Sequence, residues 1–282
     1  VLLSSVTRAA HELHVTQPTV SVQLRELADL VGEPLFQPVG RRIQPTQAAM
    51  ELAQTVSEIT QSWQRLDARL AALRGLLRGR LALAAVTTAE YFVPDLIGPF
   101  AAAHPGVEID LAVENRDRVV ERLQRGADEL TVMMLPPTDL PLERKPFMDN
   151  PLVVIASNVH PFAQRKRLRL SALSAERWLM REAGSGTRLA AQEHFAKLGF
   201  APRVAMSLGS NEAIKHSVAA GLGVAVISRL AVAPELQAPR GAKLVVLPVQ
   251  GFPIQRRWFV VWRKDRPLSA AARGFVAYLQ EQ

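Results

Sequence analysis

Hydrophobic residues between positions 46 and 77 recur at alternating steps of four and three. This spacing averages 3.5 residues, which keeps the side chains on one narrow face of a helix and is typical of a coiled coil. We predict a helix from about Thr46 to about Leu77 with an apolar seam roughly 40 Å long. The residues expected to pair with a second copy are Leu52, Val56, Ile59, Trp63, Leu66, Leu70 and Leu73. The alternative is one long helix packed on its own domain.

Two shorter helical patterns come before this seam, over residues 7–13 and from residue 17 to about residue 30. Pro18 stands at the first helical position of the second pattern, and Thr16 is placed to cap it. The positions expected to face a core are Ala9, Ala10, Leu13, Val20, Leu24 and Leu27. Two short helices with a tight turn, the second with small polar residues near its start, are typical of a helix-turn-helix.

A two-stranded wing is predicted after Gly32, with its turn at Gly40 and with Arg41 and Arg42 at the tip. A basic tip of this kind would meet phosphates or the minor groove. On the second helix, Thr19, Ser21 and other polar side chains are left outward, and hydroxyl groups can bond bases or phosphates. The alternative is a small helical domain with a solvated pair of arginines.

Strands and helices alternate from about residue 80 to the end, which predicts a parallel, doubly wound sheet. The pattern restarts after Pro161, so we expect two α/β lobes with a ligand cleft between them, as in periplasmic binding proteins. The predicted organisation is a winged helix-turn-helix over 1–45 with an incomplete N-terminus, a linker helix over 46–79 and an effector-binding domain over 80–282. We assign residues 80–157 and 264–282 to the first lobe and 158–263 to the second, with crossover strands at 152–157 and 258–263.

Three polar turns follow predicted strands, where ligand sites of α/β sheets lie. In the second of them, Ser185, Thr187 and the free N–H groups of a helix start would hold an anion, and Arg188 would add a charge-assisted bond. The alternative for Ser185 is a helix cap. We therefore expect a polar or phosphate-bearing ligand and assign its site to Thr87, Thr88, Met133, Ser185, Gly186, Thr187, Arg188, Asn211 and Glu212.

Composition excludes several other chemistries. The 282 residues include no cysteine, which rules out disulfides and thiolate chemistry and fits a reducing cytoplasm. Six scattered histidines and the absence of a nucleophile elbow predict no metal site and no catalytic residues. No apolar stretch reaches the ~20 residues of a membrane span, and no signal peptide is visible. The formal charge of +8 permits a polyanionic partner.

Because Val1 begins inside an apolar segment, we expect an incomplete N-terminus.

Several motifs resemble the LysR-type transcriptional regulators. In the first part they are Arg8-Ala9-Ala10, Val15-Thr16-Gln17-Pro18-Thr19-Val20-Ser21, Gly32-Glu33-Pro34-Leu35-Phe36, Gly40-Arg41-Arg42 and Pro45-Thr46. The resemblance implies DNA binding, with Gln17, Pro18, Thr19 and Ser21 facing the groove and Arg41 as the wing contact. The DNA-binding residues we expect are Thr16, Gln17, Pro18, Thr19, Ser21, Arg25, Arg41 and Arg42. Val22 and Pro38 stand where the family usually has arginine, which predicts weaker and less salt-dependent binding.

The second part is similar to one subgroup, the regulators of carbon-fixation (RuBisCO) operons. The motifs are residues 149–156, residues 180–188, and Gly209-Ser210-Asn211-Glu212-Ala213-Ile214-Lys215. The resemblance implies a homodimer or homotetramer on double-stranded promoter DNA, without a cofactor, that responds to a metabolite such as NADPH or a sugar phosphate. The alternative functions are a metabolite-binding sensor with weak or no DNA binding and an enzyme, for which no reactive pair stands out.

Overall fold

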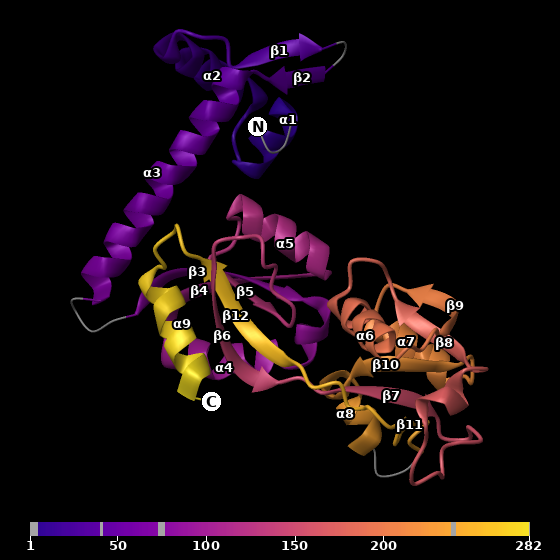
Figure 1. The fold of residues 1–282 in the computed structure, drawn as a ribbon. Coiled ribbons are helices and arrows are strands. Elements are labelled where there is room, and N and C mark those ends of the chain that lie inside the picture. The colour runs from indigo at the N-terminus through magenta and orange to yellow at the C-terminus, as the bar shows by residue number, and fades with distance from the viewer. Residues whose placement is uncertain (1–4, 40–41, 73–76, 238–240, 282) are drawn as a thin grey trace. The chain divides into compact units, whose positions relative to one another are not determined.

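The computed structural model describes residues 5–39, 42–72, 77–237 and 241–281. The chain divides into two compact units, Val1–Asp67 and Ala68–Gln282. The first unit carries two helices, a two-stranded sheet and the first part of a long helix (Figure 1). The elements are α1 (Val6–Glu12), α2 (Gln17–Val31), β1 (Phe36–Val39), β2 (Arg42–Pro45) and α3 (Gln47–Ala72). Because β1 and β2 pair antiparallel directly after the two helices, the predicted winged helix-turn-helix is confirmed.

Local side-chain bonds fix the start and the end of α2. The Thr16 hydroxyl accepts a hydrogen bond from the Thr19 N–H and lies 2.8 Å from the Thr19 hydroxyl. Gly32 ends the helix in the left-handed region at φ 79°, where glycine carries no steric cost. Thr46 joins the wing to α3, since its hydroxyl donates to the Pro34 carbonyl at 2.7 Å and accepts from the Ala49 N–H.

The core of the first unit is smaller than the sequence predicted. Among the described residues of this unit, the buried apolar side chains are Ala10, Val20, Leu35 and Ala49. Leu13 and Leu27, both predicted to face inward, are 63% and 38% exposed. Leu13 is the C-cap residue and lies past the last helical residue of α1, and Leu27 lies in the second half of α2.

The second unit contains two lobes, each built on a five-stranded sheet (Figure 1). The first lobe has the strand order β4-β3-β5-β12-β6. Helix α5 covers one face of this sheet, and α4 and α9 pack together on the other. Its elements are β3 (Arg78–Val86), η1 (Thr87–Tyr91), α4 (Val93–Ala103), β4 (Gly106–Glu114), α5 (Arg116–Arg125), β5 (Leu130–Met133), β6 (Leu142–Asp149), β12 (Arg257–Arg263) and α9 (Ala270–Glu281).

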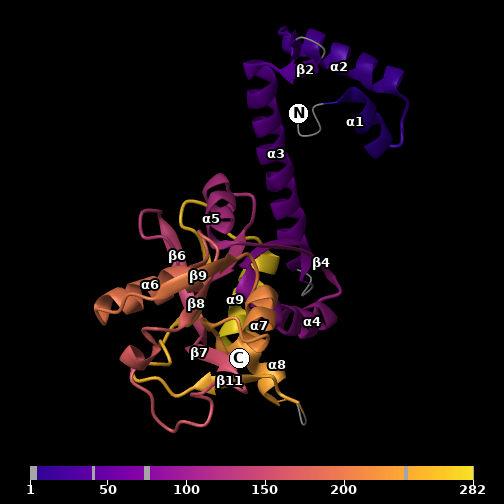
Figure 2. The same ribbon diagram turned by 90° about the vertical axis from the view of Figure 1, so that its right-hand side faces the viewer.

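The second lobe has the strand order β11-β7-β10-β8-β9. Its buried strands divide their side chains between two hydrophobic clusters, one under α6 and one under α7 and α8, and Figure 2 shows these helices on opposite sides of the sheet. The elements are β7 (Leu152–Ser157), η2 (Leu170–Leu173), β8 (Arg177–Arg181), α6 (Gly186–Lys197), β9 (Arg203–Leu208), α7 (Asn211–Ala219), β10 (Val224–Ser228), α8 (Arg229–Gln237) and β11 (Leu244–Leu247).

The predicted lobe boundaries are wrong at both crossovers. Strand β7 pairs with β10 and β11 and belongs to the second lobe, whereas β12 pairs with β5 and β6 and belongs to the first. The chain therefore crosses at Asn150–Pro151 and again at residues 254–256, where the Leu152 and Ile254 backbones exchange two hydrogen bonds. These returning strands run antiparallel to their neighbours, so both sheets are mixed and not purely parallel as we expected.

Gly223 shows how closely the second sheet is packed. It precedes β10 at φ +156°, and a Cβ there would lie 2.1 Å from the Arg177 carbonyl oxygen. We expect Gly223→Ala to lower the free energy of unfolding by about 2 kcal/mol more than Gly221→Ala, because backbone atoms would have to move. Gly221 also has a positive φ, +78°, but faces open space. Urea unfolding followed through tryptophan fluorescence tests this, and equal losses in the two variants would contradict it.

Candidate functional site

Most of the predicted DNA-facing side chains lie at the exposed start of α2, and Arg25 lies in the middle of this helix. Thr16, Gln17, Pro18 and Thr19 are exposed, as is Arg25, while Ser21 is half-buried. The Thr16–Thr19 hydroxyl pair fixes the first turn of the helix before any partner binds. Arg41 lies outside the described residues, and Arg42 is described only as the first residue of β2, opposite Val39.

The seam of α3 presents large apolar side chains to solvent. Leu52 is half-buried, whereas Val56, Ile59, Trp63 and Leu66 are exposed, Trp63 at 71%. Leu70 lies in α3, and Leu73 lies outside the described residues. A row of exposed apolar residues along one helix face is typical of a surface that a partner covers.

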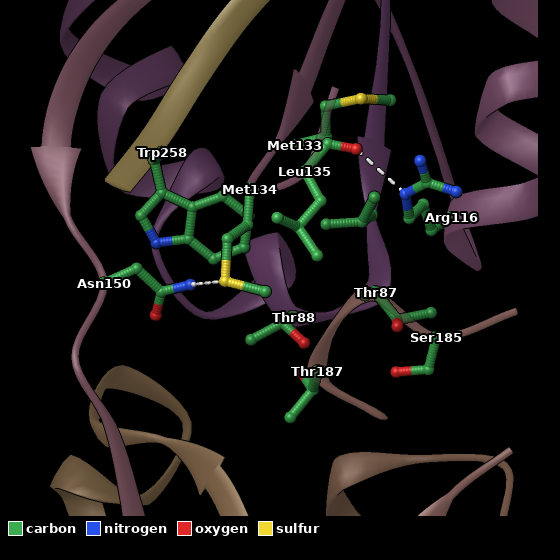
Figure 3. Close-up of a pocket in the computed structure, with 12 residues that line it drawn as sticks. Thr87, Thr88, Arg116, Met133, Met134, Leu135, Asn150, Ser185, Thr187 and Trp258 are labelled. Carbon is green, nitrogen blue, oxygen red and sulfur yellow. Dashed lines mark hydrogen bonds between the residues drawn. The ribbon is translucent and has the colours of Figure 1, made fainter. Parts of the chain in front are cut away.

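A small pocket lies between the two lobes of the second unit. Its residues come from both lobes and from the first crossing segment. In Figure 3, Arg116, Thr87 and Ser185 lie on one side, and Asn150 and Trp258 lie on the other. The lining consists of Val86, Thr87, Thr88, Arg116, Met133, Met134, Leu135, Asn150, Ser185, Gly186, Thr187 and Trp258.

The start of α6 gives the pocket an anion-binding end. Ser185 is the N-cap residue, but its side chain makes no capping hydrogen bond, so the alternative that it serves only as a cap is not supported. Thr187 and Ser185 are both buried and line the pocket beside Gly186. The N–H groups of a helix start, the positive end of the helix dipole and two hydroxyl groups together suit a phosphate or carboxylate.

Arg116 adds the pocket's only charged side chain among the described lining residues. It opens α5, directly after the Asn115 cap, and its Nε donates to the Leu135 carbonyl oxygen at 2.9 Å. This bond holds the Arg116 guanidinium at the pocket wall. The Arg116 side chain also lies close to the start of α6, because a Cβ on Gly186 would be 3.6 Å from the Arg116 Cδ. A cation held on the same side of the pocket as the helix start strengthens the preference for an anion.

A buried arginine joins the lobes beside the pocket. Arg181, at the end of β8, forms two hydrogen bonds to the Glu182 carboxylate and one of 2.7 Å to Asn211 Oδ1. Its Nη2 also donates to the Thr87 hydroxyl in the first lobe at 3.0 Å. The Asn211 amide in turn donates to the Thr88 hydroxyl. Thr87 and Thr88, which line the pocket from the first lobe, are therefore held by the second lobe.

A second contact between the lobes runs through Tyr91, Glu212 and Lys215. The Tyr91 hydroxyl donates to Glu212 Oε1 at 2.6 Å, and the Lys215 ammonium binds Glu212 and Glu235 at 2.7 and 2.5 Å. Burial and the neighbouring Glu212 raise the pKa of Tyr91, so its hydroxyl stays a donor. Burial works to raise the pKa of Glu212, but bonds from Lys215 and Tyr91 outweigh it and lower that pKa below its ordinary value.

The pocket contains six of the nine residues assigned to the ligand site from the sequence. The six are Thr87, Thr88, Met133, Ser185, Gly186 and Thr187. The other three are outside the lining and have partners within the protein. Arg188 donates to the Arg181 carbonyl and the Ser207 hydroxyl, Asn211 binds Arg181, and Glu212 binds Tyr91 and Lys215.

Sequence reasoning missed Arg116, Asn150 and Trp258. Arg116 carried a usable signal, because it follows the carboxyl end of a predicted strand and opens a helix. Asn150 and Trp258 lie at the two crossing segments, and only the three-dimensional path of the chain brings them together. Within the described residues, no three His, Asp or Glu side chains are grouped as metal ligands, and no helix is long and apolar enough to cross a membrane.

Two family models match the chain. Residues 1–50 match the bacterial regulatory helix-turn-helix protein of the lysR family, and residues 74–282 match the LysR substrate binding domain. The HTH-type transcriptional activator CmpR of Synechocystis is 41% identical over 98% of this chain and 90% of its own length. A RuBisCO operon transcriptional regulator of Acidithiobacillus ferrooxidans is 40% identical over 98% and 88%.

Two solved structures are also similar to this chain. The regulatory domain of CcmR from Synechocystis PCC6803, in complex with 2-PG (2-phosphoglycolate), is 41% identical with a TM-score of 0.68 and covers 72% of this chain and 96% of its own. Full-length CbnR bound to its target DNA has a TM-score of 0.69 over 98% of this chain and 94% of its own. At 21% identity, CbnR shows the shared fold alone.

Proposed function

Because the chain belongs to the LysR family of bacterial transcriptional regulators, we propose that it controls carbon-fixation genes in response to a short phosphorylated acid. Regulators of this family bind promoter DNA, form oligomers and bind small effectors, and they are not enzymes. The RuBisCO operon regulators at 40% identity support the target genes. A regulator must reach its promoter, so we place the protein in the cytoplasm.

The chemistry of the pocket carries this proposal. The α6 start and Arg116 supply positive potential and donors, and no carboxylate is among the lining residues in the part of the chain that the structure describes. A similar domain, at 41% identity, was solved with 2-phosphoglycolate, which has a phosphate and a carboxylate. We therefore assign the anionic group of the effector to Ser185, Gly186, Thr187 and Arg116.

The sequence suggested two effector types, a dinucleotide such as NADPH and a sugar phosphate. The domain that was solved with 2-phosphoglycolate, at 41% identity, supports a short phosphorylated effector.

The proposed mechanism connects this pocket to the DNA-reading end. The exposed start of α2 would enter the major groove, with Gln17, Thr19 and Ser21 reaching bases or phosphates. The α3 seam would pair two chains and hold two such helices at a fixed separation. An effector that binds one arrangement of the lobes better than another would shift the assembly between two spacings on the DNA.

A fluorescence-anisotropy titration tests the proposal. Full-length protein is titrated into labelled promoter DNA of a carbon-fixation operon and into a scrambled duplex, at two salt concentrations, with and without 2-phosphoglycolate. We expect preference for the promoter, an affinity that falls with salt, and a change on adding the effector. Equal affinity for both duplexes would contradict the regulator proposal. Calorimetric binding of 2-phosphoglycolate without DNA selectivity would favour the alternative of a metabolite sensor.

A further inference from the structure

The pocket contains a buried hydrogen-bond donor that has no partner. Trp258 lines the pocket, its residue is only 1% exposed, and its Nε1 makes no hydrogen bond in the described structure. Indole nitrogen is a donor only, and buried tryptophans usually find an acceptor for it. A buried donor without a partner calls for an explanation, and on a residue that lines a ligand pocket one explanation is a group that the ligand supplies.

The backbone around Trp258 is arranged to place this ring at the pocket. Trp258 is the second residue of β12, directly after the crossing segment at residues 254–256. The pairing of β12 with β6 changes register between Trp258 and Phe259, while pairing with β5 begins only at Phe259, opposite Met133. Irregularities of this kind re-aim a side chain and are common beside functional sites. The ring packs against Phe92, with ring centroids 4.9 Å apart and the ring planes tilted by 52°.

The neighbours of the indole nitrogen are already occupied. In Figure 3 the nitrogen lies on the edge of the ring near Asn150. The Asn150 amide donates to the Met134 sulfur at 3.1 Å, and its carbonyl oxygen accepts from the Ser228 hydroxyl at 2.7 Å. These bonds hold Asn150 between the two lobes, and neither of them involves the Trp258 donor.

We propose that the Trp258 N–H binds an acceptor group at the end of the effector opposite to its anionic group. The α6 start and Arg116 lie on one side of the pocket, Trp258 lies on the other, and the apolar Met134 lies between them (Figure 3). The pocket then selects short molecules with an anion at one end and a carboxylate or carbonyl oxygen at the other. This inference rests on the proposed function, because it assigns the second half of the same effector.

A ligand-truncation cycle tests the assignment. Calorimetry measures the affinity of wild type and Trp258→Phe for 2-phosphoglycolate, which has two acidic ends, and for methyl phosphate, which lacks the carboxylate. We expect Trp258→Phe to weaken 2-phosphoglycolate binding about tenfold or more, the effect of one charge-assisted hydrogen bond, and to leave methyl phosphate binding unchanged. Equal losses for both ligands, or no loss for either, would overturn the assignment. Trp262→Phe, on the same strand and outside the lining, is the matched control.

A second measurement does not depend on the variant folding well. The chain has four tryptophans, so the indole N–H region of a ¹⁵N-tryptophan spectrum is sparse. Saturation with 2-phosphoglycolate should move the Trp258 indole signal downfield, while methyl phosphate should leave it in place. A Trp258 signal that does not respond to saturating 2-phosphoglycolate would overturn the assignment even if the Phe variant binds poorly.

The outcomes separate this inference from the proposed function. Tight 2-phosphoglycolate binding with no dependence on Trp258 would remove only the indole contact. If wild type does not bind 2-phosphoglycolate but binds malonate with the expected Trp258 dependence, the phosphorylated effector is wrong and the indole contact stands. Failure to bind 2-phosphoglycolate, 3-phosphoglycerate and malonate alike would overturn both.

Discussion

Replacing Leu66 with lysine should convert the protein to a monomer and lower its affinity for promoter DNA at least 100-fold. Leu66 lies in the exposed seam of α3, where a charge would be buried against the partner helix without a counter-ion. A dimer binds two half-sites with an effective concentration that a monomer lacks, and that advantage is worth about 10²–10⁴ in affinity. The effector pocket lies wholly in the second unit, so 2-phosphoglycolate binding should remain nearly unchanged.

Light scattering and anisotropy measure the two effects on the same preparation. Gln54→Lys is the matched control, because Gln54 is exposed on α3 about 200° around the helix from the seam residue Leu52. Lysine there can replace the present bond of Gln54 to Glu58 with an ion pair one turn apart. An unchanged oligomer in the Leu66 variant, or equal effects of both substitutions, would refute the coiled-coil assignment.

Elements with local start and stop signals were predictable from the sequence to within a residue or two. The bounds of α5 agree because Asn115 caps its start through the Arg118 N–H and Gly126 ends it in the left-handed region. The start of α2 was predictable for the same reason, with Thr16 and Pro18 at its first turn. Such signals act within four residues, so they do not depend on what the rest of the chain does.

Sheet membership was not predictable, because it depends on pairing between distant segments. β7 and β12 are apolar runs that either lobe could bury, and only the registers with β10 and β5 assign them. Strand β6 was missed because its sequence, Leu142–Asp149, contains four charges and a proline and lacks a clear alternation. A partly exposed edge position tolerates such a sequence.

The residues of the candidate site were likewise predictable only where their sequence signal is local. The turn at Ser185–Thr187 could be found because a helix start after a strand is a local signal. Asn211 and Arg188 also lie near helix starts that follow strands, but both of them bind Arg181. Asn211 accepts a hydrogen bond from the Arg181 guanidinium, and Arg188 donates one to the Arg181 backbone carbonyl. Nothing in the sequence around Arg181 indicates that this arginine is buried. Polar residues near a predicted site therefore cannot be assigned to the ligand until their partners in the protein are known.

Replacing Arg116 with glutamine should weaken 2-phosphoglycolate binding by about 10- to 100-fold. The side chain is 18% exposed, and its Nε bond to the Leu135 carbonyl holds it against the pocket. A hydrogen bond to a charged group contributes about 1.5–3 kcal/mol, which corresponds to this range of affinities. Glutamine keeps a donor but loses the charge and the forked geometry, so Arg116→Lys, which keeps the charge, should lose less.

The control for this substitution lies on the same helix. Arg118→Gln makes the same change of charge at a side chain that is 66% exposed and pairs with Glu121 at 2.8 Å. If Arg116 acts only through the general positive field of the domain, both variants should weaken binding equally, and the loss should disappear at high salt. If it contacts the anion directly, as we propose, only the Arg116 variant should lose affinity, and calorimetry should show most of that loss persisting at high salt, since a partly buried contact is screened less.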